Sequence, residues 1–256
     1  MSLMLFVEKV AKAQSEIQSI EKLTLTNPNL TVEEAYEIQR MSMEKSLTEQ
    51  NQLIGWKMGL TSTAKQKQVG VDSPIYGRLT TNMNLKKSVI KAEEYIHPRV
   101  EAEIAFVFNK ELKGSHLTPL EVWPAIESVF LALEVIDSRY ENFSFSLQDV
   151  VADNASSSKV LLSPQAFSPY ATDWSAIKVN LKHNGEEKLE GTGAAVLGHP
   201  IYSVIELLNM LAKEGRGILP GQLVLTGGIT DAIAVRTGDK IEADYGSFGV
   251  LSLNVE

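Results

Sequence analysis

The sequence predicts an α+β fold in which a helical N-terminal region precedes a rolled, mixed β-sheet. Residues 4–50 carry apolar side chains at helical spacing. From residue 80 onward, most apolar runs have the length and alternation of strands. Residues 221–256 form short apolar runs separated by glycine turns, a pattern typical of a rolled or barrel-like sheet.

The composition excludes several classes of protein. The 256 residues, 44% of them hydrophobic, are enough for one large domain or two unequal ones. A net charge of −8 argues against electrostatic binding to nucleic acid or to an anionic membrane. The apolar runs fall short of the roughly 18 residues that span a bilayer, and no signal peptide is evident. The absence of cysteine excludes disulfides and thiolate chemistry, and we expect a compact cytoplasmic enzyme.

We divide the chain into an N-terminal region, 1–78, and a C-terminal β-roll domain, 79–256. In the first region, residues 4–22 are predicted to form one helix. A second helix is predicted after Thr31, because Glu34 three residues later completes a capping box. We expect these helices to pack against the body or to support an oligomer rather than to carry chemistry.

The N-terminal region also contains a short strand with one lysine in an apolar setting. Lys57 lies in the run LIGWKMG, between Gly55 and Gly59. A lysine at this place either protects an exposed sheet edge or is a positioned cation, and the local sequence favours neither. Further on, Asp72 opens a turn that leads to Tyr76.

The stretch HPRVEAEIAFVFNKEL, residues 97–112, is predicted to be a strand that is buried on both faces. Glu101 and Glu103 lie on one face of it, because alternate residues of a strand share a face. At about 6 Å and an effective dielectric of roughly 20, two such carboxylates repel each other by roughly 3 kcal/mol before any desolvation cost. Protonation, pairing with lysine or arginine, or binding of a hard divalent cation relieves this cost.

A third carboxylate favours the cation. Glu134 stands alone in the apolar run VFLALEVI, where it has no packing role. Carboxylates without a neighbouring histidine or cysteine suit Mg²⁺ or Mn²⁺ rather than zinc. A bare Glu-x-Glu pair is more commonly a solvated pair on an edge strand, but the apolar setting of all three glutamates favours metal. The C-terminal domain is therefore the predicted metal-binding domain.

The rest of the chain is predicted to alternate between helices and strands. A helix starts at Thr118, with proline next to it, and continues through Phe130 before the strand of the third glutamate. A hairpin with a type I′ turn is predicted around Asn184 and Gly185. Residues 201–214 are predicted to form a helix with a leucine-rich buried face.

Two polar segments are candidates for ligand contacts. The loop at residues 153–158 is rich in serine and acidic or amide groups, and it is either a well-made turn or a binding loop. The Gly227–Gly228 pair either lets backbone N–H groups approach an anionic ligand closely or forms a tight corner. His199, which precedes a proline, is expected to be structural rather than a ligand.

Taken together, several segments resemble one family. They are GWKMGLTS, GVDSPIYG, RVEAEIAFVF, LEVIDSRYENF, VVADNASSS, AAVLGHP and VLTGGIT. The family is the 2-hydroxypentadienoate hydratase and 4-oxalocrotonate decarboxylase group of the fumarylacetoacetate hydrolase superfamily, and the likeness runs from about residue 52 to the end. KMGLTS, PIYG, DSRYENF and TGGIT look like the decarboxylase branch. Trp56 departs from the family pattern, which expects a smaller or aliphatic residue, and this affects the predicted pocket shape.

The resemblance implies a fumarylacetoacetate-hydrolase-like mixed β-roll that holds Mg²⁺ or Mn²⁺ by Glu101, Glu103 and Glu134. It implies a homo-oligomer and, in some members, a complex with a homologous hydratase of the meta-cleavage catabolism of aromatic compounds. The implied substrate is a small-molecule 2-oxo dicarboxylate, 2-oxohex-3-enedioate. Its decarboxylation gives 2-hydroxypenta-2,4-dienoate and CO₂.

For this reaction the candidate catalytic residues are Lys57, Asp72 and Asp153. Lys57 would place a positive charge beside the 2-oxo oxygen or the departing carboxylate. The predicted substrate-binding residues are Ser158, Thr226, Gly227, Gly228 and Arg139. Asp72, Asp153 and Arg139 would orient the reacting groups.

Three alternatives stay open. A hydratase would add water to the terminal alkene of 2-hydroxypenta-2,4-dienoate through the same dienolate. A hydrolase would cleave a carbon–carbon bond of an acylpyruvate, but it needs a general base for water, and only His97 and His199 lie in the motifs. A non-catalytic scaffold would bind a structural cation with the same carboxylates.

Overall fold

A computed structural model of the chain describes residues 2–62, 66–67, 71 and 73–256. The α-helices of the described residues are α1 (Leu3–Glu16), α2 (Leu23–Thr26), α3 (Val32–Ser46), α5 (Pro119–Val122), α6 (Leu147–Ala152) and α7 (Pro200–Lys213). The strands are β1 (Leu53–Gly59), β2 (Ile75–Thr80), β3 (Val89–Ile90), β4 (Arg99–Phe108), β5 (Leu112–Lys113), β6 (Ile126–Ile136), β7 (Ser157–Leu162), β8 (Lys178–His183), β9 (Glu186–Thr192), β10 (Gly217–Ile218), β11 (Leu223–Leu225), β12 (Ile233–Ala234), β13 (Lys240–Asp244) and β14 (Val250–Val255).

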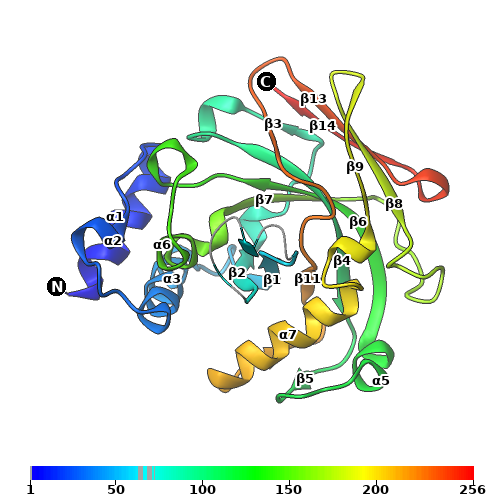
Figure 1. Ribbon diagram of the computed structural model, residues 1–256, viewed down its shortest axis with the longest axis horizontal. Coiled ribbons are helices and arrows are strands. Elements are labelled where there is room, and N and C mark those ends of the chain that lie inside the picture. The colour runs from blue at the N-terminus through cyan, green and yellow to red at the C-terminus, as the bar shows by residue number, and fades with distance from the viewer. Residues whose placement is uncertain (1, 63–65, 68–70, 72) are drawn as a thin grey trace.

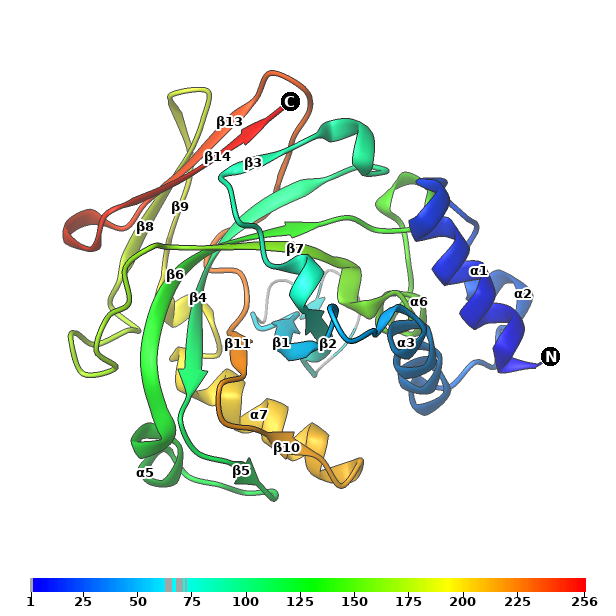
Figure 2. The same ribbon diagram turned by 180° about the vertical axis from the view of Figure 1, so that it is seen from behind.

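A seven-stranded sheet carries the predicted acidic residues. Its order is β2-β1-β11-β4-β6-β7, and β12 also pairs with β4. A five-stranded sheet has the order β3-β14-β13-β8-β9, and β10 pairs with β5. Figures 1 and 2 show β6 as a long curved strand, with β8, β9, β13 and β14 at one end of the molecule and the N-terminal helices on the opposite side. The predicted α+β class with a curled, mixed sheet is confirmed.

Two local predictions in this framework are confirmed. Thr31 caps α3, because its side chain accepts a hydrogen bond from the Glu34 N–H and the Glu34 carboxylate accepts one from the Thr31 N–H. The hairpin of β8 and β9 turns at Asn184 and Gly185, whose φ values are 54° and 83°. Positive φ at both residues is the requirement of a type I′ turn.

Two helix predictions are wrong in extent. The helix predicted at 4–22 ends at Glu16, where Ile17 turns into the left-handed region with φ of 53°. The helix predicted at 118–130 lasts for one turn, and strand β6 begins two residues after Pro124. Proline has no N–H with which to continue a helix, and the apolar residues that follow pair with β4 along its whole length. A short, continuously apolar run fits both the helical and the strand periodicity, so its pairing with a distant strand determines which structure it forms.

The division of the chain at residue 78 remains a prediction. Strand β1 lies in the N-terminal region but pairs in parallel with β11 of the C-terminal one. Strand β2 crosses the boundary and pairs with β1. Backbone hydrogen bonds of one sheet therefore join the two regions.

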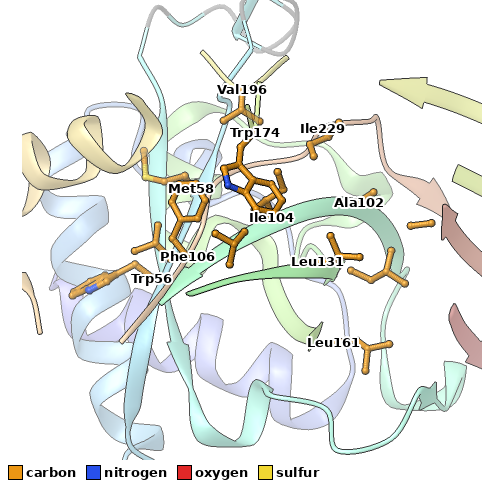
Figure 3. Close-up of a cluster of buried hydrophobic side chains, with 14 of the residues drawn as sticks. Trp56, Met58, Ala102, Ile104, Phe106, Leu131, Leu161, Trp174, Val196 and Ile229 are labelled. Atoms are coloured by element: carbon orange, nitrogen blue, oxygen red, sulfur yellow. The ribbon is translucent and has the colours of Figure 1, made fainter. Parts of the chain in front are cut away.

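The main hydrophobic core lies on the face of β4 that does not carry the glutamates. Ile104 and Phe106 of β4 belong to one buried cluster with Trp56 and Met58 of β1 and with Trp174 (Figure 3). Trp56, the residue that departs from the family pattern, thus fills this core. Because neighbouring strand residues face opposite ways, the lysine between Trp56 and Met58 points to the other side of the sheet.

Helix α7 is a core helix. By length and composition, the segment Gly193–Lys213 is apolar enough to cross a membrane, and it is the candidate span found in the described part of the chain. Ile201, Leu207 and Leu211, however, are buried in the main core. His199 precedes the helix, and its Nδ1 accepts a hydrogen bond from the Ile201 N–H at 3.0 Å. The expectation of a structural role for His199 is confirmed.

Candidate metal centre

Three carboxylates meet on the face of β4 and β6 that lies away from the main core. Glu101 of β4 is directly opposite Glu134 of β6 in the antiparallel register. Glu103 lies two residues further along the same face of β4. One oxygen from each side chain lies within 4.8 Å of the others. Glu101 is 7% exposed and the other two are fully buried, so the fold brings together the glutamates singled out in the sequence.

Lys57 supplies a positive charge to this carboxylate cluster. Its Nζ lies 3.0 Å from Glu134 Oε2 and donates a hydrogen bond to the Ala155 carbonyl at 3.1 Å. Strand β1 lies inside the sheet, and Lys57 is 2% exposed, so it is a positioned cation rather than the guard of a sheet edge. Burial alone lowers the pKa of Lys57, but the charges of Glu134, Glu101 and Glu103 outweigh it and the pKa is raised. The ammonium therefore stays charged.

Two of the three carboxyls lie where their charged forms are disfavoured. Burial raises the pKa of Glu103 well above its ordinary value, and the charges of Glu134 and Glu101 raise it further. Burial likewise raises the pKa of Glu134, against the lowering effect of Lys57. The cluster therefore favours an additional positive charge, either a proton or a cation.

The hydrogen bonds around the cluster favour a cation. Glu103 Oε2 accepts from the Gly227 N–H at 2.8 Å, and Glu134 Oε1 accepts from Ser157 Oγ at 2.9 Å. Glu103 Oε1 is buried and has no hydrogen-bond partner among the described residues. A desolvated carboxylate oxygen without a donor is costly unless it binds a cation. The cluster offers only carboxylate oxygens, which suits Mg²⁺ or Mn²⁺ better than zinc.

Gly227 and Tyr245 hold the carboxylate cluster in place through hydrogen bonds that involve the backbone. Gly227 has a φ of +117°, and a Cβ at this position would lie 2.1 Å from Thr61 Oγ1, so only glycine fits. The Gly227 N–H donates its hydrogen bond to an anion of the protein itself, the carboxylate of Glu103. The hydroxyl of Tyr245 lies 2.9 Å from the carbonyls of both Glu103 and Ala132, and so ties β4 to β6 beside the cluster.

A cavity of about 570 Å³ opens beside the cluster. Lys57, Glu101 and Gly228 line it, so the cavity reaches the ammonium and one of the carboxylates. Its walls also include Arg99, Ser156, Asp231, Phe143 and Phe145. A hollow of this size with a few charged groups suits a small polar ligand.

Three other predicted site residues contact protein groups. Arg139 and Asp153 form a buried ion pair with each other. Burial raises the pKa of Asp153 to about 6, against the lowering effect of Arg139. Thr226 donates its hydroxyl hydrogen to the Ile104 carbonyl at 3.0 Å. Asp72 lies outside the described residues.

The structure adds residues that the sequence did not single out. Ser157 donates a hydrogen bond to a glutamate of the cluster, while substrate binding by its neighbour Ser158 stays a prediction. Only one of two consecutive strand residues can face the cluster, and the sequence did not indicate which. Arg99 could have been found, because it lies two residues before Glu101 on the same face of the strand. Tyr245 gave no comparable signal, since it comes from a distant segment.

Comparison with known proteins defines the class to which this fold and site belong. The model for the C-terminal part of fumarylacetoacetate (FAA) hydrolase matches residues 42–256. The chain therefore belongs to the fumarylacetoacetate hydrolase family.

Within the family, the chain is similar to enzymes of two activities. It is 41% identical over 246 residues to 4-oxalocrotonate decarboxylase of Pseudomonas putida, and the aligned residues cover 96% of this chain and 93% of the relative. It is 33% identical over 250 residues to 2-keto-4-pentenoate hydratase of Paraburkholderia xenovorans (strain LB400), covering 97% and 93%. The solved structure of 4-oxalocrotonate decarboxylase from Pseudomonas putida G7, complexed with magnesium and adipate, matches with a TM-score of 0.96 and 39% identity over 99% of this chain and 97% of that one. The family resemblance predicted from the motifs is confirmed.

Proposed function

We propose that the protein catalyses the metal-dependent decarboxylation of 4-oxalocrotonate (2-oxohex-3-enedioate) in the catabolism of aromatic compounds. The products are 2-hydroxypenta-2,4-dienoate and CO₂. The observation that carries this proposal is the buried cluster of Glu101, Glu103 and Glu134, which lies with Lys57 beside a small cavity. The 41% identity to a 4-oxalocrotonate decarboxylase over 96% of the chain supports this choice of substrate.

We assign Glu101, Glu103 and Glu134 as ligands of Mg²⁺ or Mn²⁺. The fit rests on the all-carboxylate donor set and on the buried Glu103 Oε1, which lacks a hydrogen-bond partner among the described residues. The similar decarboxylase structure is complexed with magnesium and the dicarboxylate adipate. When bound, the cation supplies Lewis-acid stabilisation for the negative charge that develops on the 2-oxo oxygen.

In this reaction the protein needs to stabilise the negative charge that develops on the substrate, and it does not need to supply electrons. The substrate is a vinylogous β-keto acid. When the bond to the distal carboxylate breaks, CO₂ leaves and the electron pair is delocalised through the alkene onto the 2-oxo oxygen. Protonation of that oxygen by one proton from solvent gives the dienol product, so atoms and electrons balance with no other reactant.

Lys57 is the residue that we assign to stabilise the developing negative charge. Its ammonium is buried, remains charged and lies on the cavity wall. The Ala155 carbonyl holds the Nζ in place, and the buried pair of Arg139 and Asp153 supports the loop that carries Ala155. Gly228 lines the cavity without a side chain, so a substrate carboxylate can approach its backbone.

Turnover of 4-oxalocrotonate with release of CO₂ tests the proposal. We expect turnover with Mg²⁺ and loss of turnover with EDTA. Glu103→Gln should stay folded by circular dichroism but bind metal weakly and lose roughly 100- to 1,000-fold in turnover. Glu127→Gln is the matched control, because Glu127 is an exposed residue of the same strand as Glu134. Undiminished turnover by Glu103→Gln in EDTA would refute the assignment.

A hydratase is the second candidate, because the chain is also 33% identical to a 2-keto-4-pentenoate hydratase over 97% of its length. The two activities share the dienolate but differ in the substrate consumed. Incubation with 2-hydroxypenta-2,4-dienoate separates them. Consumption of this compound, together with no CO₂ from 4-oxalocrotonate, would establish the hydratase instead.

We further propose that the protein is cytoplasmic, forms a homo-oligomer and pairs with a homologous hydratase. Exposed apolar side chains on the N-terminal helices support an oligomer, since Met4, Leu5 and Leu25 are 41%, 52% and 65% exposed. Size-exclusion chromatography with light scattering measures the oligomer. A monomer over the whole working range of concentration would contradict this part of the proposal.

A further inference from the structure

Arg99 lies on the same side of the sheet as the carboxylate cluster. It is the first residue of β4. Residues 99, 101 and 103 are every second residue of that strand, so their side chains share one face. Arg99 and Glu101 are separated by roughly 6.6 Å along the strand axis. Both side chains line the cavity, together with Lys57. Among the described residues, the cavity therefore has two cationic groups on its walls: Lys57 beside the carboxylate cluster, and Arg99 two residues before Glu101 on β4.

The guanidinium of Arg99 is held in position but is not neutralised. Its Cζ lies 3.9 Å from the centre of the Phe143 ring, a cation–π contact. Asn142 and Phe143 have φ values of 57° and 53°, so the turn that presents this ring is held in a conformation that large side chains rarely adopt. Arg99 forms no hydrogen bond or ion pair with a described residue, and Asp231 on the same cavity wall does not pair with it. Its N–H donors are therefore available to a ligand.

We propose that Arg99 binds the distal carboxylate of the 2-oxo dicarboxylate and thereby selects dicarboxylates over monocarboxylates. This inference rests on the proposed function and adds a specificity-determining residue to it. With the 2-oxo acid end at the carboxylate cluster, the distal end of the substrate reaches Arg99. An extended six-carbon chain is about 6 Å between its terminal carbons, which is comparable with the separation of Arg99 and Glu101 along β4. The planar guanidinium matches a carboxylate with two parallel hydrogen bonds.

The charge change in the reaction determines which kinetic constant depends on Arg99. The distal carboxylate begins with a negative charge beside the guanidinium and leaves as neutral CO₂, while its electron pair passes to the dienolate. The attraction to Arg99 is therefore weaker in the transition state than in the bound substrate. An interaction of this kind increases the affinity for the substrate and slightly slows the chemical step, so its removal should raise KM without lowering kcat.

Binding of two matched ligands tests this inference. 2-Oxoadipate and 2-oxohexanoate share the chain length and the 2-oxo acid, differ only in the distal carboxylate, and lack the alkene needed for loss of CO₂. By isothermal titration with Mg²⁺, we expect the wild type to bind 2-oxoadipate roughly 10- to 100-fold more tightly than 2-oxohexanoate. Arg99→Gln should bind both with the affinity of the wild type for 2-oxohexanoate. In turnover, its KM for 4-oxalocrotonate should rise by the same factor while kcat stays within about threefold.

Two further variants control the experiment. Arg236→Gln removes an exposed arginine outside the cavity and should keep both affinities. Arg99→Lys keeps the charge but not the forked geometry, and should retain part of the preference for 2-oxoadipate. An unchanged preference in Arg99→Gln, or an equal loss for both ligands, would overturn the inference while leaving the proposed function intact. If the wild type with Mg²⁺ binds neither ligand, the proposed function fails and the inference fails with it.

Discussion

The ammonium of Lys57 and the carboxylate of Glu134 are both buried and lie 3.0 Å apart, so the removal of either leaves the other charge in an apolar setting. A buried ion pair is not a net stabiliser by default, because desolvation costs about as much as the attraction returns. The contribution of this pair is geometric. It keeps a positive charge on the wall of the cavity, beside the place where negative charge develops in the proposed reaction.

Lys57→Met separates the charge effect from the metal site. The variant keeps the apolar stem but removes the ammonium, so we expect kcat for 4-oxalocrotonate to fall roughly 100- to 1,000-fold. The affinity for Mn²⁺ should not fall, because the loss of a positive charge leaves the three carboxylates more attractive to a cation. Steady-state kinetics and calorimetric titration with Mn²⁺ measure the two effects.

Lys178→Met is the control for Lys57→Met, since Lys178 is an exposed lysine of β8. It should retain both turnover and metal affinity. If Lys57→Met lost Mn²⁺ binding together with activity, Lys57 would be a support of the metal site rather than a group acting on the substrate.

At the scale of secondary-structure elements, predictions from sequence succeeded where the signal is local. The capping box at Thr31 and the turn at Asn184 and Gly185 depend on residues within a few positions, and both are present. The alternation of residues 97–112 predicted β4 and the shared face of its two glutamates, which the ladder with β6 confirms. Each of these signals is contained in one short stretch.

Predictions failed or stayed open where a distant strand decides the outcome. The apolar run after Pro124 fits a helix by pattern, but it pairs with β4 and becomes β6. Lys57 could be placed on an edge or in the interior only after β11 was known to lie beside β1. Which serine faces Glu134 depends on the register of β7, and that register is irregular next to Ile136.

Helix α7 provides a test of pH dependence at the scale of an element. Burial lowers the pKa of His199, against the raising effect of Asp173. Its neutral Nδ1 accepts the hydrogen bond that caps α7 at the Ile201 N–H. In the unfolded chain, the pKa of histidine is about 6.5, so below this pH the unfolded state takes up a proton that the folded state lacks. The contribution of His199 to stability is therefore present above about pH 6.5 and is lost as the pH falls.

His199→Asn should remove this dependence, because asparagine caps helices well and does not titrate. Between about pH 7.5 and about pH 5.5, the free energy of unfolding of the wild type should fall by roughly 0.5 kcal/mol more than that of the variant, a small value because the ring is partly exposed to screening solvent. Urea denaturation at the two pH values measures the difference. His116→Asn, at an exposed histidine with positive φ, is the control and should follow the wild type. Identical pH profiles for His199→Asn and the wild type would exclude a titrating cap.

At the scale of the whole molecule, the curled sheet brings together charges that are far apart in the sequence. Lys57 comes from β1, Glu101 and Glu103 from β4 and Glu134 from β6. Without a cation, the fold must hold the carboxylates of β4 and β6 together against their mutual repulsion. The unfolded chain does not bear this cost, because the same residues are separated and hydrated. Binding of a divalent cation to the folded state alone should therefore stabilise the whole fold.

We expect Mg²⁺ or Mn²⁺ to raise the temperature of unfolding, and EDTA to lower it again. At a metal concentration of about 100 times Kd, the stabilisation is about 2.7 kcal/mol, which corresponds to roughly 5–10 °C for a chain of this length. Differential scanning calorimetry with and without metal measures the shift. In Glu103→Gln the shift should disappear, and the variant in EDTA should unfold at a higher temperature than the wild type in EDTA, because one buried negative charge is gone. A shift of equal size in Glu103→Gln would mean that the cation binds elsewhere, since this substitution removes the negative charge of Glu103, whose Oε1 has no hydrogen-bond partner among the described residues.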